Sequence, residues 1–187
     1  MGTGGGWQDT IGGIHKRFKL ITSEKGIYQN LKVKNINIKN ENLEELNKRF
    51  LLINTGERRL SRTLLKQVIE RYIGNIEENV INLDKIKNIA DKMVEILEKG
   101  NIDDFAKLLN EQWNCSLKII PETTNNLING IFKLIDEYID GKMICGPGGG
   151  GFFQIILKKG INHDIIKEKL KEMFGDSDIC IYECEFE

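Results

Sequence analysis

The sequence is poor in the residues that mark metal centres, disulfide frameworks and domain linkers. Its 187 residues include four cysteines, none in a CxxC pair, and only two prolines. We therefore expect no cysteine-held metal site and no disulfide framework, and a reducing, cytoplasmic setting is the default for such a chain. Because no Pro/Ser/Gly-rich linker divides it, the length suits one domain of ordinary size.

Neither sign of charge dominates, and long apolar runs are missing. The chain carries 27 basic and 28 acidic residues, a formal net charge of −1. This balance gives no bulk reason to expect nucleic acid or an anionic membrane as a partner. No apolar run approaches the roughly 20 residues that cross a bilayer, and the first residues resemble no signal peptide.

The order of apolar patterns predicts an α+β fold. Alternating residues at 18–21 and 31–38 favour paired strands, and the continuous apolar run at 50–53 favours a buried strand. Stripes of helical period follow, and the chain then returns to strands around one more helix. The ranges are helices near 64–73, 86–97, 105–113 and 128–139, strands near 143–145 and 151–157, a helix near 165–174 and a strand near 179–186. This order predicts an antiparallel sheet with helices on one face.

Two glycine clusters stand near opposite ends of the chain. Gly146-Pro-Gly-Gly-Gly-Gly151 lies between two expected strands, where its glycines allow positive φ and close approach to an anion. A bulged or flexible hairpin connection is the alternative interpretation. Gly2-Thr-Gly-Gly-Gly6 matches part of a dinucleotide fingerprint, but no strand precedes it in this sequence, so we reject that hypothesis.

Two polar segments are candidate sites. Asp9 follows the first glycine cluster and could accept a proton from a substrate hydroxyl, although an isolated Asp at this place more often caps a turn or helix. Thr55-Gly-Glu-Arg-Arg59 follows the end of the expected buried strand, where loops often carry binding groups. Its arginines could bind phosphate or paired hydroxyls, or could simply be solvated.

Taken together, these segments resemble the L-fucokinase type of GHMP sugar kinase. The matching pieces are Gly-Gly-Gly-Trp-Gln-Asp at 4–9, Thr55-Gly56 with Arg59, and Gly146-x-Gly-Gly-Gly-Gly-Phe152. The resemblance covers essentially the whole chain. It includes the kinase part of the bifunctional fucokinase/fucose-1-phosphate guanylyltransferases.

The resemblance implies transfer of the γ-phosphoryl group of ATP, with Mg²⁺, to a sugar hydroxyl. Asp9 would lie against that hydroxyl, and Trp7 and Gln8 would shape the sugar site. Thr55, Gly56 and Arg59 would form a substrate-side loop, and a second loop would abut the phosphates. The second loop comprises Gly146, Gly148, Gly149, Gly150 and Gly151.

The resemblance also implies a domain organisation. Residues 1–54 would be the trailing part of the kinase N-terminal domain. Residues 55–187 would be the C-terminal domain, a ferredoxin-like antiparallel sheet with helices on one face.

The sequence departs from the family pattern in three ways. The family's Gln-Asp-Gln is Gln8-Asp9-Thr10 here, and Pro147 replaces an alanine, which removes an N–H from the glycine loop. The family's ATP-binding loop, which precedes the Trp-Gln-Asp motif, has no counterpart. We therefore expect this chain alone to be inactive and to need the missing N-terminal half or a homodimer partner, with apolar surface exposed where that partner packs.

Two other functions remain open on the sequence. A heptose-phosphate kinase half would share the Thr-Gly-x-x-Arg and glycine-loop elements, although Trp7 favours the fucokinase type. A non-catalytic remnant that binds a sugar or a partner protein is the second alternative.

Overall fold

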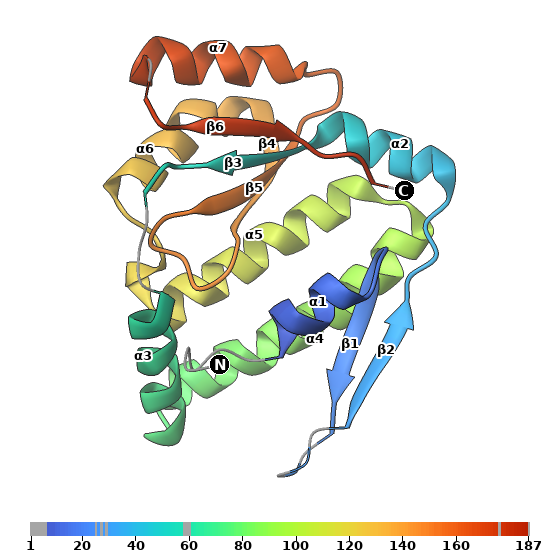
Figure 1. Ribbon diagram of the computed structural model, residues 1–187, viewed down its shortest axis with the longest axis vertical. Coiled ribbons are helices and arrows are strands. Elements are labelled where there is room, and N and C mark those ends of the chain that lie inside the picture. Colours follow the sequence, from blue (N-terminus) through green and yellow to red (C-terminus); the bar gives the residue numbers. More distant parts are fainter. Residues whose placement is uncertain are drawn as a thin grey trace.

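The computed structural model describes residues 7–24, 26, 28, 30–57, 61–175 and 177–186, without the side chains of residues 9, 61 and 62. Figure 1 shows an α+β architecture in which a four-stranded sheet is packed with helices and a separate hairpin lies beside the long helices. The helices are α1 Gln8–Ile14, α2 Asn40–Arg49, α3 Ser61–Ile73, α4 Glu77–Lys99, α5 Ile102–Ile119, α6 Asn126–Ile135 and α7 His163–Phe174, with 3₁₀ turns η1 Pro121–Thr123 and η2 Asp136–Tyr138. The strands are β1 Lys19–Ser23, β2 Leu31–Asn35, β3 Phe50–Asn54, β4 Ile139–Ile144, β5 Phe152–Leu157 and β6 Cys180–Glu183.

The main sheet has the order β4-β5-β3-β6, and every neighbouring pair is antiparallel. Helices separate β3 from β4 and β5 from β6, so the chain follows a β-α-β-β-α-β course with the first and third strands central. The α+β class and the ferredoxin-like antiparallel sheet are confirmed. β3 lies within the range 1–54 but pairs with β5 and β6, so the sheet extends across the expected domain boundary.

Helices cover both faces of this sheet, whereas the sequence pattern predicted helices on one face. Leu51 and Ile53 of β3 and Phe153 of β5 point to the face packed by α6 and α7, in a core with Ile131, Ile135 and Ile166. The alternate residues Phe50 and Ile156 point to the other face, against Leu46 of α2, Leu97 of α4 and Ala106 of α5. The apolar stripe of a helix does not show which face of the sheet that helix covers, so the sequence pattern could not distinguish one helix layer from two.

The second face is covered only at one end. β5 is buried continuously from Ile155 to Leu157, but Phe152 is 39% exposed, as is typical where only one face is packed. Phe152 contacts Tyr182 of β6, with ring centroids 5.9 Å apart. The uncovered end of the sheet is therefore the end nearest the loop before Phe152.

Helix α5 lies almost directly on β4. A Cβ atom at Gly141 would come within 2.8 Å of the backbone and side chain of Ala106, so the small residues permit this close packing. Asn110 of α5 bridges the two elements, because its amide donates to Asp140 O at 2.8 Å and its Oδ1 accepts from Lys142 N at 2.9 Å. These contacts fix the long helix layer relative to the sheet.

The side chain of Arg49, at the end of α2, joins the elements at the other end of the sheet. It is 3% exposed and its Nε donates to Leu157 O at 2.7 Å. Its other nitrogens contact Asp103 of α5 at 2.7 Å, Asp140 of β4 at 2.9 Å and Glu45 at 2.8 Å. The Arg49 hydrogen bond holds the pKa of Asp103 below its usual value, against the opposing effect of burial.

The β1–β2 hairpin forms a second, two-stranded sheet next to α4. Phe18, which precedes β1, contacts Phe186 with ring centroids 5.0 Å apart, and Phe186 contacts Phe50 at the same distance. This aromatic cluster attaches both the hairpin and the C-terminal segment to the start of β3.

Most of the expected elements are present, with three differences. α1 and α2 were not expected, and the fourth expected helix ends at Ile135, because Ile139 begins β4. Ile135 and Ile139 are both buried in the same core. In the sequence Ile139 therefore continues the apolar stripe of the helix, although it belongs to β4. Within the described residues, no helix has the length and apolar character needed to cross a membrane.

We predict that Arg49→Met destabilises the fold strongly. It would leave Asp103, Asp140 and the Leu157 carbonyl without their shared donor, and removing one member of a buried pair costs about 3 kcal/mol when the carboxylates still reach solvent. The free energy of unfolding from urea titration should fall by that amount. Lys48→Met removes the adjacent exposed cation and serves as the control; equal losses in both variants would contradict the role of Arg49.

Candidate functional site

The glycine loop connects β4 to β5 at the uncovered end of the sheet. Its glycines at 146, 148, 149, 150 and 151 all have positive φ, between 72° and 150°. At Gly148, where φ is 88°, a Cβ atom would come within 2.3 Å of the Thr123 carbonyl oxygen. A side chain at Gly148 is therefore excluded both by the backbone conformation and by a neighbouring main chain.

The Thr55-Gly56 turn lies directly against this loop. Thr55 is buried, and both its N–H and its Oγ1 donate to Gly151 O, at 2.8 and 3.1 Å. Gly151 N donates in return to Glu57 O at 2.9 Å, and Glu57 N donates to Thr55 Oγ1 at 3.3 Å. Two segments almost a hundred residues apart in sequence thus form one hydrogen-bonded unit.

A third segment, Thr123 to Asn125, completes this unit and was not expected from the sequence. Gly149 N donates to Thr123 O at 2.6 Å, and the Asn125 amide donates to both Glu57 Oε2 and Gly149 O. Asn125 Oδ1 also accepts from Ile128 N at 2.8 Å and so caps α6. An Asn before an apolar helical stripe could have predicted the cap, but nothing in the pattern connected it to the glycine loop.

The Trp7-Gln8-Asp9 motif lies elsewhere in the fold. Gln8 and Asp9 begin helix α1, which lies beside the start of β1, where Lys19 Nζ donates to Gly12 O at 3.1 Å. Within the described part of the chain, no hydrogen bond joins α1 to the Thr55 turn or to the glycine loop. Arg59 and the glycines at 4–6 lie outside the described residues, so their expected roles stay predictions.

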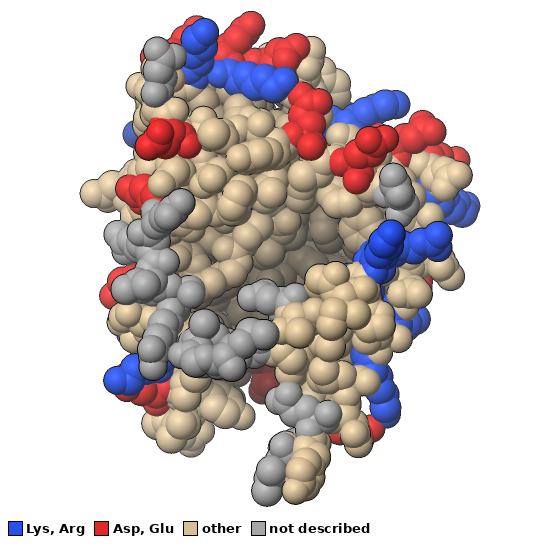
Figure 2. Space-filling view, in the orientation of Figure 1, with Lys and Arg blue, Asp and Glu red and all other residues tan. Residues whose placement is uncertain are grey.

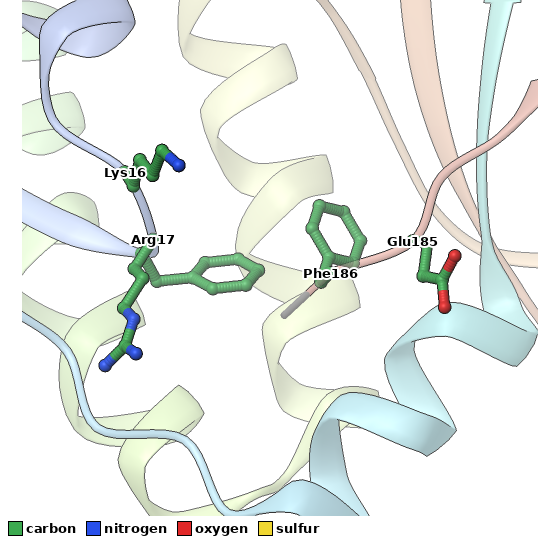
Figure 3. Close-up of a pocket in the computed structure, with 5 residues that line it drawn as sticks. Lys16, Arg17, Glu185 and Phe186 are labelled. Atoms are coloured by element: carbon green, nitrogen blue, oxygen red, sulfur yellow. The ribbon is translucent and has the colours of Figure 1, made fainter.

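The surface between these two groups of residues is hollowed. Figure 2 shows the hollow between the sheet and the surface over α1, with a mostly uncharged described lining and basic residues at one rim. A cavity of about 520 Å³ is lined by Lys16, Arg17, Phe18, Glu185 and Phe186 (Figure 3). Phe186 packs on Phe50 at the start of β3, whereas Thr55 follows its end, so this cavity and the glycine loop lie at opposite ends of that strand.

The glycine loop can offer an anion only part of its backbone. Pro147 has no N–H, and the N–H groups of Gly149 and Gly151 donate to Thr123 O and Glu57 O. No hydrogen bond among the described residues uses the amides of Gly146, Gly148 and Gly150, so these are the ones that could bind a phosphate in this conformation. This set fits one wall of a phosphate site better than a complete cradle.

The described residues contain no cluster of three or more His, Cys, Asp or Glu side chains that could hold a metal ion. Mg²⁺ prefers oxygen ligands and usually retains several waters. The fit to ATP phosphates rests on the loop amides alone.

Cys145 immediately precedes the glycine loop. Burial, with a smaller contribution from Cys184, raises the pKa of the Cys145 thiol to about 11. Because the thiolate is the nucleophilic form, this cysteine is protonated and unreactive at neutral pH. The four cysteines are free, in agreement with the expected absence of a disulfide framework.

Comparison with known proteins identifies relatives among carbohydrate kinases. The chain is 29% identical over 182 residues to a bifunctional fucokinase/GDP-fucose pyrophosphorylase from Arabidopsis thaliana, covering 97% of this chain and 17% of the relative. It is 28% identical to an L-fucokinase/L-fucose-1-P guanylyltransferase from Bacteroides fragilis, covering 83% and 16%. It is 30% identical to a D-glycero-alpha-D-manno-heptose 7-phosphate kinase from Campylobacter jejuni, covering 92% and 50%. No model of a protein family matches the chain.

Solved structures share the fold. A mevalonate kinase from L. major superposes with a TM-score of 0.68 at 17% identity, covering 87% of this chain and 47% of that one. A Lactococcus lactis galactokinase gives 0.59 at 13% identity, covering 91% and 51%.

These comparisons confirm that the fold is shared with GHMP kinases. They also confirm the resemblance to sugar kinases of the L-fucokinase type. The chain spans about half the length of the heptose kinase relative and about one sixth of the two bifunctional relatives.

We predict that Gly148→Ala disrupts the loop more than Gly146→Ala. Both positions have positive φ, but a Cβ at Gly146 meets nothing within 4 Å, whereas one at Gly148 collides with the Thr123 carbonyl. The free energy of unfolding should fall by about 1 kcal/mol for Gly146→Ala and by at least about 2 kcal/mol for Gly148→Ala. Similar losses in urea titrations of the two variants would contradict the close approach of Gly148 to the Thr123 carbonyl.

Proposed function

We propose that this chain is the C-terminal part of an ATP-dependent kinase that converts L-fucose to L-fucose 1-phosphate. The observation that carries the proposal is the direct bonding between Thr55 and Gly151, which joins the expected sugar-side loop to the expected phosphate-side loop. Two of the relatives carry fucokinase in their names, and the pairing brings together segments that the resemblance assigned to one site.

Each candidate residue would have its own role in the transfer of the phosphoryl group. Asp9 would accept or orient the proton of the reacting hydroxyl, with Trp7 and Gln8 beside the sugar. The turn at Thr55 and Gly56, with Arg59, would bind the sugar side, and the glycine loop would abut the transferred phosphoryl group. Because phosphoryl transfer depends mainly on positioning and charge stabilisation, a hydrogen-bonded pair of loops suits this reaction.

ATP and Mg²⁺ would be held largely by sequence outside these 187 residues. The partial set of loop amides supports this division. We propose that the residues before β3 end the N-terminal kinase domain, and that β3, which pairs with β5 and β6, belongs with residues 55–187 to the C-terminal one. The remaining half would be contributed by the same polypeptide or by a partner chain.

Exposed apolar side chains support such a partner. Ile69, Tyr72 and Ile73 of α3 and Ile76 at the turn into α4 are between 46% and 76% exposed. Phe152 and Tyr182 add exposed rings at the uncovered end of the sheet. Clustered exposure of this kind is unusual for a monomer.

A heptose-phosphate kinase is the second candidate. The Campylobacter jejuni relative is 30% identical and is named for D-glycero-alpha-D-manno-heptose 7-phosphate. Trp7, before Gln8-Asp9, is the residue that favours L-fucose.

The protein expressed from the whole reading frame that contains this chain should phosphorylate L-fucose with ATP and Mg²⁺. It should act more slowly on the heptose 7-phosphate, and the isolated 187 residues should be inactive. Asp9→Asn should lower kcat by roughly 10²- to 10⁴-fold, as expected for loss of a general base. Coupled ADP-release assays on both sugars measure these rates.

Three results would each remove one part of the proposal. Faster turnover of the heptose 7-phosphate would show that this sugar, and not L-fucose, is the substrate. Activity of the isolated chain would disprove the need for a second half. Full activity of Asp9→Asn would exclude Asp9 from proton transfer.

A further inference from the structure

Asn125 bonds simultaneously to the two loops of the candidate site and to the helix that follows it. Its Oδ1 accepts from Ile128 N at 2.8 Å, which caps α6. Its Nδ2 donates to Glu57 Oε2 at 2.5 Å and to Gly149 O at 3.3 Å. One half-buried side chain thus joins the helix that follows it to two loops that are remote in sequence.

The two ends of the Asn125 amide have different chemical requirements. The cap needs only an oxygen acceptor, which Asp, Ser or Thr could supply equally well. The bonds to Glu57 and Gly149 need a donor, which those residues could not direct to both acceptors. Asn at this position is therefore not explained by helix capping alone.

The glycine loop depends on such external bonds for its shape. Glycine loses more conformational freedom on folding than any other residue, so a run of glycines does not hold its own conformation. Here Gly149 N is bonded to Thr123 O and Gly151 N to Glu57 O. The Asn125 amide joins these two attachments, because it contacts the side chain of Glu57 and the carbonyl of Gly149.

From this geometry we propose that Asn125 is a positioning residue that fixes the glycine loop relative to the Thr55–Glu57 turn. The proposal rests on the proposed function in one respect, that the two loops bind the two sides of a phosphoryl transfer. Its role in transfer is indirect: Asn125 sets the distance between the loops. Displacements of about 1 Å at a distance from the reacting atoms can lower turnover 10²-fold.

Amide hydrogen exchange tests the positioning without any assay of activity. Asn125→Asp retains the cap acceptor but removes both donor bonds, and Asn125→Ala removes all three. In both variants we expect exchange at Gly149 and Gly151 to rise by at least about tenfold, since the loop would no longer be held against Thr123 O and Glu57 O, the acceptors of these amides. Asn129→Ala, which loses only an exposed bond to Thr124 one turn later, should leave these rates within about twofold of wild type.

Kinetics of the full-length protein then separate positioning from helix stability. We expect Asn125→Asp to lower kcat by roughly 10- to 100-fold while KM for the sugar changes less. Adding Glu57→Gln should partly restore kcat, because the introduced side-chain amide can donate to the new carboxylate at position 125. A role in capping alone predicts instead that Asn125→Asp keeps wild-type kcat.

The outcomes distinguish this inference from the proposed function. Wild-type exchange rates at Gly149 in Asn125→Asp, or wild-type kcat in that variant, would overturn the positioning role. If exchange rises as expected but the wild-type protein phosphorylates neither sugar, the proposed function is wrong and Asn125 still fixes the glycine loop relative to the Thr55–Glu57 turn.

Discussion

The hydrogen-bonded ion cluster of Arg49 is the interaction on which the arrangement of the sheet and helices depends. One buried guanidinium contacts carboxylates of α2, α5 and β4 and the last carbonyl of β5. Burying an arginine is costly unless its donors are paired, so the cluster forms only when these elements meet in one arrangement. At the opposite ends of β3 and β5 helices cover only one face of the sheet, and the loops of the candidate site begin there.

The candidate site is built from those loops without a buried ion. Backbone donors and acceptors of Thr55, Gly149 and Gly151 form the contacts, and Asn125 adds the side-chain link. Such a site has little charge of its own, in agreement with the mostly uncharged hollow in Figure 2. Charge for binding phosphate would then come from groups outside the described residues, which fits a site completed by another segment.

The sequence predicted the strands and most helices because their apolar patterns are clear, as in the continuous apolar run at 50–53 that forms β3. It also predicted that the Thr55 turn and the glycine loop belong together, through resemblance rather than periodicity. It could not predict α2, whose apolar residues are few, or the long-range contacts of Arg49 and Asn125. Those contacts join residues 24 to 108 positions apart, and no local pattern encodes such pairs.

The central claim is that the glycine loop and the Thr55 turn form one wall of a nucleotide and sugar site. The most direct measurement follows backbone amide resonances of the full-length protein on addition of L-fucose and a non-hydrolysable ATP analogue with Mg²⁺. We predict shifts at Gly148, Gly150 and Thr55, and none at Gly160, a glycine of positive φ outside the site. Shifts confined to other regions, with these loop amides unchanged under saturating ligand, would contradict the account.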